Sequence, residues 1–444
     1  MRDVKRTLLA VFVLGLFPAS AAAGPVTSVP GASGPGPSRY DRVSYERFGP
    51  AAAKRVLILV PGTQGGAGDF SLVGPDIARR VPGLQVWAYE RRSQAFEDHT
   101  GFATGDPDRA FGYYLGGEAI GSRRFAPVAG ATVPFVRDWG LKLALEDLRR
   151  VVGRARRGGR QVILGGHSLG ASMALAYAAW DFGGRAGHRD LSGLVLIDGG
   201  LLGTFTSPRL AGVRRRLAAL RTSDPFLDLL GLNVPWASGV LSATAGLYTR
   251  LRPDARATLT DFPLLPASLR APFPVTNEAA LGYAFDRTTS PAALALIQVR
   301  AGRVAATGDP RPWQDGEVTP IRNLARLFGR SPVDATEWYF PTRLSLDVDG
   351  ASGLGRNAVT RLLGLRVHHR RTLRLPLYAL QTDLTNGRVL RGARRLITSS
   401  RIPARRAKLV DASRENSHLD PLTAAPARSR FLKTIVPFLR RTAR

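Results

Sequence analysis

The chain has 444 residues, of which 44% are hydrophobic and 22% charged, and its formal net charge at pH 7 is +29. This composition excludes a disordered protein and predicts one large core with an insertion, or two domains, and the lack of cysteine excludes disulfides and thiolate metal sites. The basic residues are spread along the chain, so we expect no specific nucleic-acid partner and only weak attraction to anionic surfaces.

The first residues follow the order of a secretory signal peptide, which we assign to 1–23. Basic residues at 1–6 precede an apolar run at 8–17 and small residues at 19–24. The apolar run is too short for a permanent membrane span, and the sequence contains no run of eighteen apolar residues. We therefore expect a secreted protein, extracellular or periplasmic, after cleavage. Segment 24–39, rich in Gly, Pro and Ser, is expected to be a flexible lead-in.

Two early strands and a glycine-rich loop follow. The alternating segment 40–48 predicts an antiparallel strand, and the continuous apolar run 56–60 predicts a strand buried on both faces, as in a parallel sheet. The loop at 61–70 can direct backbone N–H groups toward a ligand. It lacks the Lys-Ser/Thr pair of a phosphate-binding P-loop, so we favour an oxyanion-binding loop.

The segment 161–176 predicts a buried strand, a tight turn and a helix, with Ser168 in the turn. Glycines stand two residues on either side, at Gly166 and Gly170, where side chains would collide with the neighbouring strand and helix. Such a turn exposes the serine hydroxyl at the sheet edge. Ser168 is therefore the candidate nucleophile.

The rest of the chain predicts a sheet interrupted by a long insertion. Further strands are expected at 86–89, 191–197, 375–383 and 407–410, with helices at 138–152 and 428–441, whereas 91–134 gives no clear pattern. Strand and helix alternate, which indicates a mostly parallel sheet flanked by helices. Segment 201–372 breaks this rhythm and is interpreted as a large, mainly helical cap or lid between the two halves of the core, 40–200 and 373–444.

A serine nucleophile needs an imidazole to take its proton and a carboxylate to orient that imidazole. His418 follows the last predicted strand and is the expected base. Asp198 and Asp383 both end apolar strands, and Asp383 is favoured because it lies closer along the chain to the strand that supplies His418. Asp198 is the alternative acid.

Backbone N–H groups are expected to bind the oxyanion. One donor is predicted at Leu169, directly after the nucleophile at a helix start, and the second at Thr63 or Gln64.

The segments 166–170, 61–63 and 418–421, together with Asp383, resemble the α/β-hydrolase superfamily. The resemblance covers about 40–200 and 373–440, and it implies an eight-stranded, mostly parallel sheet, a Ser-His-Asp triad and acyl-enzyme chemistry without cofactor or metal. Pro61 departs from the family pattern, because many members carry histidine before the glycine of the oxyanion loop.

A serine nucleophile and a cap with many aromatic residues favour an exported serine hydrolase that cleaves carboxylic esters of a small molecule or lipid. The alternatives are an exported serine aminopeptidase and a catalytically silent binding protein on the same fold.

Overall fold

The computed structural model describes residues 24–205, 207–263 and 265–442. The predicted signal peptide, 1–23, lies outside these ranges. No helix within them is long and apolar enough to cross a membrane.

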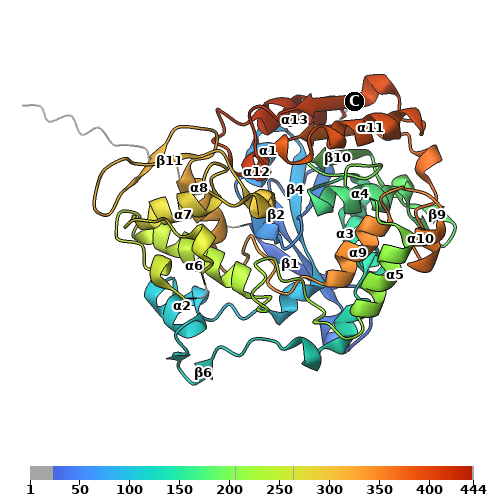
Figure 1. Ribbon diagram of the computed structural model, residues 1–444. Coiled ribbons are helices and arrows are strands. Elements are labelled where there is room, and N and C mark those ends of the chain that lie inside the picture. Colours follow the sequence, from blue (N-terminus) through green and yellow to red (C-terminus); the bar gives the residue numbers. More distant parts are fainter. Residues whose placement is uncertain (1–23, 206, 264, 443–444) are drawn as a thin grey trace, which may run out of the picture.

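An eight-stranded sheet forms the centre of the molecule (Figure 1), in the order β1-β2-β4-β3-β7-β10-β13-β14. The pairs β1–β2 and β2–β4 are antiparallel and all others are parallel, which confirms the predicted fold class, a mostly parallel α/β sheet. The strands are β1 (Val26–Pro30), β2 (Arg42–Phe48), β3 (Arg55–Val60), β4 (Leu84–Glu90), β7 (Gln161–His167), β10 (Gly193–Ile197), β13 (Leu377–Gln381) and β14 (Ala407–Asp411).

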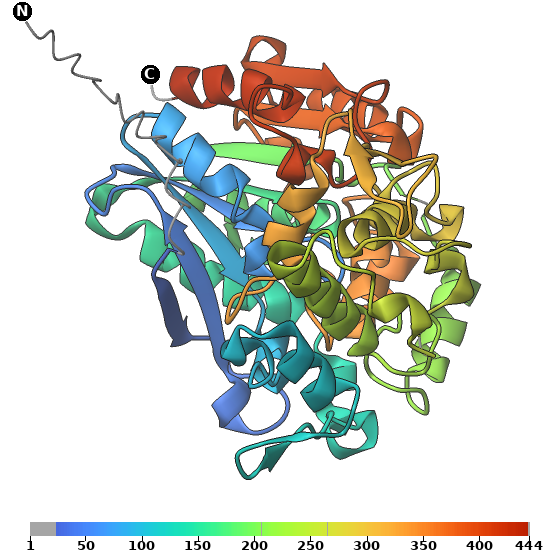
Figure 2. The ribbon, with the colours of Figure 1, turned by 90° about the vertical axis from the view of Figure 1, so that its left-hand side faces the viewer.

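Helices cover both faces of the sheet because its central strands are apolar on both sides. In β3, Val56, Ile58 and Val60 pack with α3 (Leu141–Ala155) and α4 (Leu169–Ala179), whereas Leu57 and Leu59 pack on the opposite face with α1 (Val73–Arg80) and α13 (Arg430–Arg441). Figure 2 shows α1 and α13 side by side. The period of two along a continuously apolar strand explains this double burial.

The prediction of a flexible lead-in at 24–39 is wrong for residues 26–30. These residues form β1, which pairs antiparallel with β2 and places Val29 opposite Val43. Val29 also packs against the core, so burial of this side chain adds to the pairing.

The predicted insertion is mainly helical. Its outer parts pack with the core of the sheet, namely α5 (Leu210–Ala219), α9 (Thr342–Gly350) and the loop after α10 (Ala358–Leu362). Between them, α6 (Ala237–Leu251), α7 (Asn277–Phe285) and α8 (Ile321–Phe328) pack together on one side of the molecule, at the left in Figure 1. These three helices form the part of the insertion that stands apart from the sheet.

Helix α11 (Arg388–Thr398) packs on β13 and β14 and contributes to the core. The short or peripheral elements include α2 (Pro107–Tyr114), α12 (Asp420–Thr423) and the hairpins β5 (Ala119–Ile120) with β6 (Arg123–Arg124), β8 (Asp181–Phe182) with β9 (Arg185–Ala186), and β11 (Gly302–Val304) with β12 (Trp313–Asp315).

Candidate active site

Ser168 stands between β7 and α4 in a strained conformation, with φ 56° and ψ −123°. A Cβ atom on Gly166 would lie 2.6 Å from the carbonyl oxygen of Val60, and one on Gly170 would lie 2.0 Å from the same atom. The two glycines therefore allow β7 and α4 to approach β3 as closely as the turn requires, as the sequence predicted. Such strain is held only where the surrounding packing fixes it, and it often marks a functional residue.

The carboxylate that contacts the predicted base is Asp198. Nδ1 of His418 lies 2.6 Å from Oδ2 of Asp198, and both side chains are buried, with exposed fractions of 1% and 0%. Asp198 follows β10 directly, and His418 lies in the loop between β14 and α12. The strand β10 lies next to β7, which carries Ser168 at its end.

The expected pairing of His418 with Asp383 is therefore wrong. Asp383 has turned away into a short helical segment after β13, where its carboxylate faces Arg300 and Arg287 at 3.3 and 3.5 Å. It also accepts a hydrogen bond from Oγ of Ser417. Asp383 thus contacts the loop that carries His418, but not the imidazole.

Asp198 is held as an anion. Its Oδ1 accepts a hydrogen bond from the backbone N–H of Thr382 at 2.8 Å, and its Oδ2 accepts one from the Thr382 hydroxyl. Burial alone would raise the pKa of Asp198, but the hydrogen bonds from His418 and Thr382 outweigh it and hold that pKa below its usual value. A carboxylate that accepts the proton of Nδ1 leaves Nε2 of His418 as the basic nitrogen.

His167 supports the loop that carries His418. Its Nε2 lies 2.9 Å from the carbonyl oxygen of His418, and the two rings are 4.3 Å apart. Burial, together with the neighbouring His418 ring, lowers the pKa of His167 to about 3. His167 is therefore neutral and donates through Nε2–H, which fixes the backbone of His418.

The loop after β3 lies against the nucleophile. A Cβ atom on Gly62 would lie 3.1 Å from Cβ of Ser168. The backbone N–H groups of Thr63 and Gln64 donate no hydrogen bond to any residue in the described ranges. Leu169 is the first residue of α4, a position whose N–H has no acceptor within its own helix. The three predicted oxyanion donors thus lie in the two segments that flank Ser168.

Arg91, which no sequence pattern predicted as a functional residue, binds the carbonyl groups of the loop after β3. The buried guanidinium donates to the carbonyl oxygens of Pro61, Gly62 and Gly65, and to Oε2 of Glu337 at 2.7 Å. The N–H groups of Thr63 and Gln64, which lie between these carbonyl groups, have no acceptor among the described residues. The one available signal was the position of Arg91, directly after β4.

A cavity with about 1350 Å³ of empty space, part of it open to solvent, connects Ser168 and His418 to the helices of the insertion. Gly62, Thr63 and Gln64 line it at the sheet end. The other walls are mostly apolar and come largely from α6, α7 and the segment between them, with leucines at positions 241, 259, 265, 269 and 281. An apolar cavity with a few polar groups at one end is typical of a site for a largely apolar ligand.

Comparisons with known proteins add little at the level of sequence. No family model matches the chain, and no curated protein matches it. Among solved structures, the chain is similar to a candidate lipase from Sulfolobus solfataricus, with 14% identity over 94% of this chain and 93% of that chain and a TM-score of 0.47. It is also similar to a candidate epoxide hydrolase from Klebsiella pneumoniae, with 12% identity over 94% and 97% of the two chains and a TM-score of 0.40. A third is a thermophilic esterase from Thermogutta terrifontis, with 13% identity over 94% and 99% and a TM-score of 0.38. These likenesses are distant, since each of the three TM-scores lies below 0.5.

Proposed function

We propose that the protein is a serine hydrolase that cleaves carboxylic esters with an apolar acyl group through an acyl-enzyme on Ser168. The observation that carries this proposal is the buried hydrogen bond between His418 and Asp198. The imidazole of His418 lines the same cavity as Ser168, the nucleophile candidate, whose backbone is strained. The acid of the proposed triad is Asp198 and not Asp383.

The reaction would proceed in two steps. Oγ of Ser168 attacks the ester carbonyl carbon while Nε2 of His418 takes the hydroxyl proton, and Asp198 stabilises the imidazolium. The carbonyl oxygen becomes an anion, which the backbone N–H of Leu169 and that of Thr63 or Gln64 bind. The C–O bond to the alcohol breaks as His418 returns the proton to the leaving oxygen. Water then repeats the sequence on the acyl-enzyme and releases the acid.

The apolar cavity supports an acyl chain as the group that fills it. Five of its leucines belong to α6, α7 and the intervening segment, and their side chains offer no hydrogen bonds along the length of a chain. Burial contributes about 0.8 kcal/mol for each CH₂ group, so binding is expected to strengthen with chain length until the cavity is filled.

A panel of substrates tests this proposal. The purified protein is assayed on p-nitrophenyl esters from acetate to palmitate and on aminoacyl p-nitroanilides. We expect ester hydrolysis whose kcat/KM rises with chain length, and no cleavage of the anilides. Cleavage of the anilides alone would favour the aminopeptidase, and no turnover of either class would favour the silent binding protein.

We also propose that the hydrolase is exported, on the basis of the signal-peptide pattern at 1–23. Fractionation of producing cells tests it: the protein is expected outside the cytoplasm with a new N-terminus near residue 24. Full-length protein confined to the cytoplasm would contradict export without affecting the proposed chemistry.

A further inference from the structure

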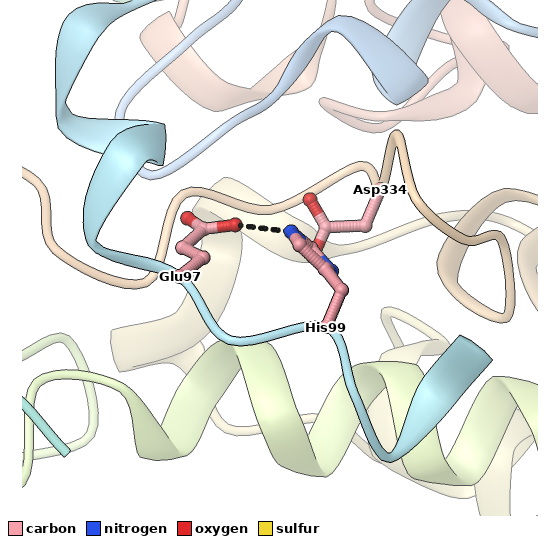
Figure 3. A group of neighbouring side chains, drawn as sticks. All are labelled: Glu97, His99 and Asp334. Carbon is pink, nitrogen blue, oxygen red and sulfur yellow. Dashed lines mark ion pairs between the residues drawn. The ribbon is translucent and has the colours of Figure 1, made fainter. Parts of the chain in front are cut away.

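Three side chains that could bind a metal ion meet at a place where none of them lines the cavity that contains Ser168 (Figure 3). Glu97, His99 and Asp334 each place one possible ligand atom within 4.8 Å of the others. Oε2 of Glu97 lies 3.2 Å from Nε2 of His99. Glu97 and His99 come from the loop that follows β4, and Asp334 comes from the segment after α8.

Two atoms of this cluster are buried without a hydrogen bond. The side chain of Glu97 is 0% exposed, and its Oε2 forms no hydrogen bond with any residue in the described ranges. Nδ1 of His99 is also buried without a hydrogen bond, although the His99 side chain as a whole is 22% exposed. Figure 3 shows the Glu97 carboxylate directed at the ring of His99. Unsatisfied buried polar atoms are costly, so a buried carboxylate oxygen that has no hydrogen bond and lies beside other possible metal ligands points to a cation.

The surroundings also favour a cation. The neighbouring cation Arg91 is bound to Glu337. Within the described residues, neither Glu97 nor Asp334 forms an ion pair with an arginine or a lysine.

Trp338 orients both carboxylates. Its backbone N–H donates to Oε1 of Glu97 at 2.8 Å, and its indole N–H donates to Oδ2 of Asp334 at 2.9 Å. Hydrogen bonds of this kind orient metal-ligating carboxylates and stabilise their sites. They leave Oε2 of Glu97 free to face His99.

We propose that Glu97, His99 and Asp334 bind one Zn²⁺ ion. Imidazole nitrogen together with two carboxylates suits Zn²⁺, whereas Ca²⁺ and Mg²⁺ favour all-oxygen sites. Bonds of about 2.0 Å in a tetrahedron place neighbouring ligand atoms about 3.3 Å apart. The Glu97–His99 separation of 3.2 Å already meets that requirement.

The bound ion would join the loop after β4 to the segment that holds the oxyanion loop. The carbonyl oxygens of Asp334 and Ala335 accept hydrogen bonds from the N–H groups of Gly68 and Gly66 at 2.8 and 3.0 Å. The N–H of Glu337 donates to the carbonyl oxygen of Gln64 at 2.8 Å. The proposed zinc is therefore structural, and its binding is measurable whether or not Ser168 is a nucleophile.

Binding of the metal alone tests the site. The full-length protein as produced is analysed for metal, stripped with EDTA, and titrated with Zn²⁺ by calorimetry. We expect one zinc ion per chain and a rise in Tm when Zn²⁺, but not Ca²⁺ at the same concentration, is returned to the stripped protein. Co²⁺ is expected to give the visible absorption bands of a tetrahedral site.

Single substitutions at the ligands supply the second arm. His99→Gln and Asp334→Asn are each expected to weaken Zn²⁺ binding by at least about tenfold, since even loss of an outer hydrogen-bond partner costs about that much. The control is His188→Gln, which changes a histidine bonded to Thr372 at another part of the surface and should bind Zn²⁺ like the wild type.

The proposal is overturned by any of three results. The stripped wild type fails to bind Zn²⁺, or binds Ca²⁺ in preference, or the His99→Gln variant binds Zn²⁺ as tightly as the wild type. The Tm measurement on the stripped wild type gives an answer even where a variant fails to fold.

Discussion

Replacing Asp198 by asparagine separates the role of this carboxylate from that of Asp383. In the structure one oxygen of Asp198 faces Nδ1 of His418 and the other faces the backbone N–H of Thr382. An asparagine must direct its NH₂ group at one of these partners. Toward His418, the NH₂ group makes Nδ1 an acceptor and moves the ring proton to Nε2, where the base is needed. If the NH₂ group points toward Thr382 instead, it faces the backbone N–H of Thr382, and two hydrogen-bond donors oppose each other in a buried place.

The first arrangement preserves the fold and removes the base, so we expect Asp198→Asn to lower kcat by about 10,000-fold. This corresponds to about 5 kcal/mol of transition-state stabilisation. The assay is hydrolysis of a p-nitrophenyl ester, with circular dichroism and Tm to confirm folding.

The matched control is Asp383→Asn, which keeps an acceptor for Ser417 and weakens partly exposed pairs with Arg287 and Arg300. Such pairs contribute about 0–1 kcal/mol, so kcat should change by less than about fivefold. A severe loss in Asp383→Asn, with near-normal turnover in folded Asp198→Asn, would refute the assignment.

Three further predictions concern the groups around this pair. Arg91→Lys removes the guanidinium that binds three carbonyl groups of the oxyanion loop, so kcat should fall by about 10- to 100-fold with little change in KM. The control Arg92→Lys alters the buried ion pair with Asp147 and not the oxyanion loop, so its kcat should stay near normal. Equal losses in the two variants would contradict the positioning role. Ala284→Phe places a ring in the cavity and should shift the ester preference to shorter chains, and the exposed Ala293→Phe should not; an unchanged chain-length profile would show that the cavity does not hold the acyl chain. Burial keeps the pKa of His167 at about 3, below the value of about 6.5 in an unfolded chain, so the unfolded state binds more protons between these pH values. The free energy of unfolding should therefore fall as the pH falls below about 6.5, by up to about 1.4 kcal/mol per pH unit from this group, and urea unfolding of His167→Gln should show a shallower slope. An identical slope in the variant would contradict a neutral His167.

The parts of the fold that the sequence predicted well are those with strong local patterns. The continuous apolar run of β3 required burial on both faces, and Gly166 and Gly170 required a close approach of backbone to Val60. The strand at 26–30 was missed because β1 is a short edge strand inside a segment rich in Gly, Pro and Ser, and its pairing with β2 holds it in place.

The sequence could not show whether Asp198 or Asp383 contacts His418, because distance along the chain does not reveal the register of the strands. Asp198 follows its strand directly, and in the register of β10 with β13 its backbone N–H donates to the carbonyl oxygen of Leu380. Asp383 comes three residues after Leu380, beyond the point where the chain turns into a helical segment. Nearness to His418 along the sequence favoured Asp383, whereas the register of the sheet brings Asp198 to the imidazole.

Arg91 and the cluster of Glu97, His99 and Asp334 share a different difficulty. Arg91 interacts with Glu337, and Glu97 and His99 lie beside Asp334, so each of these residues is more than 200 positions from its partner along the chain. Arg91, Glu97 and His99 also lie in a stretch of sequence without hydrophobic periodicity. Only the folded structure shows that the side chains of Arg91, Glu97 and Asp334 are buried.

The central claim, that Ser168 is an activated nucleophile, is tested most directly by mass spectrometry after reaction with a fluorophosphonate. We predict one adduct per chain, located by peptide mapping on Ser168, and none on folded Ser168→Ala. An unmodified folded wild type, or equal labelling of Ser168→Ala, would contradict the account.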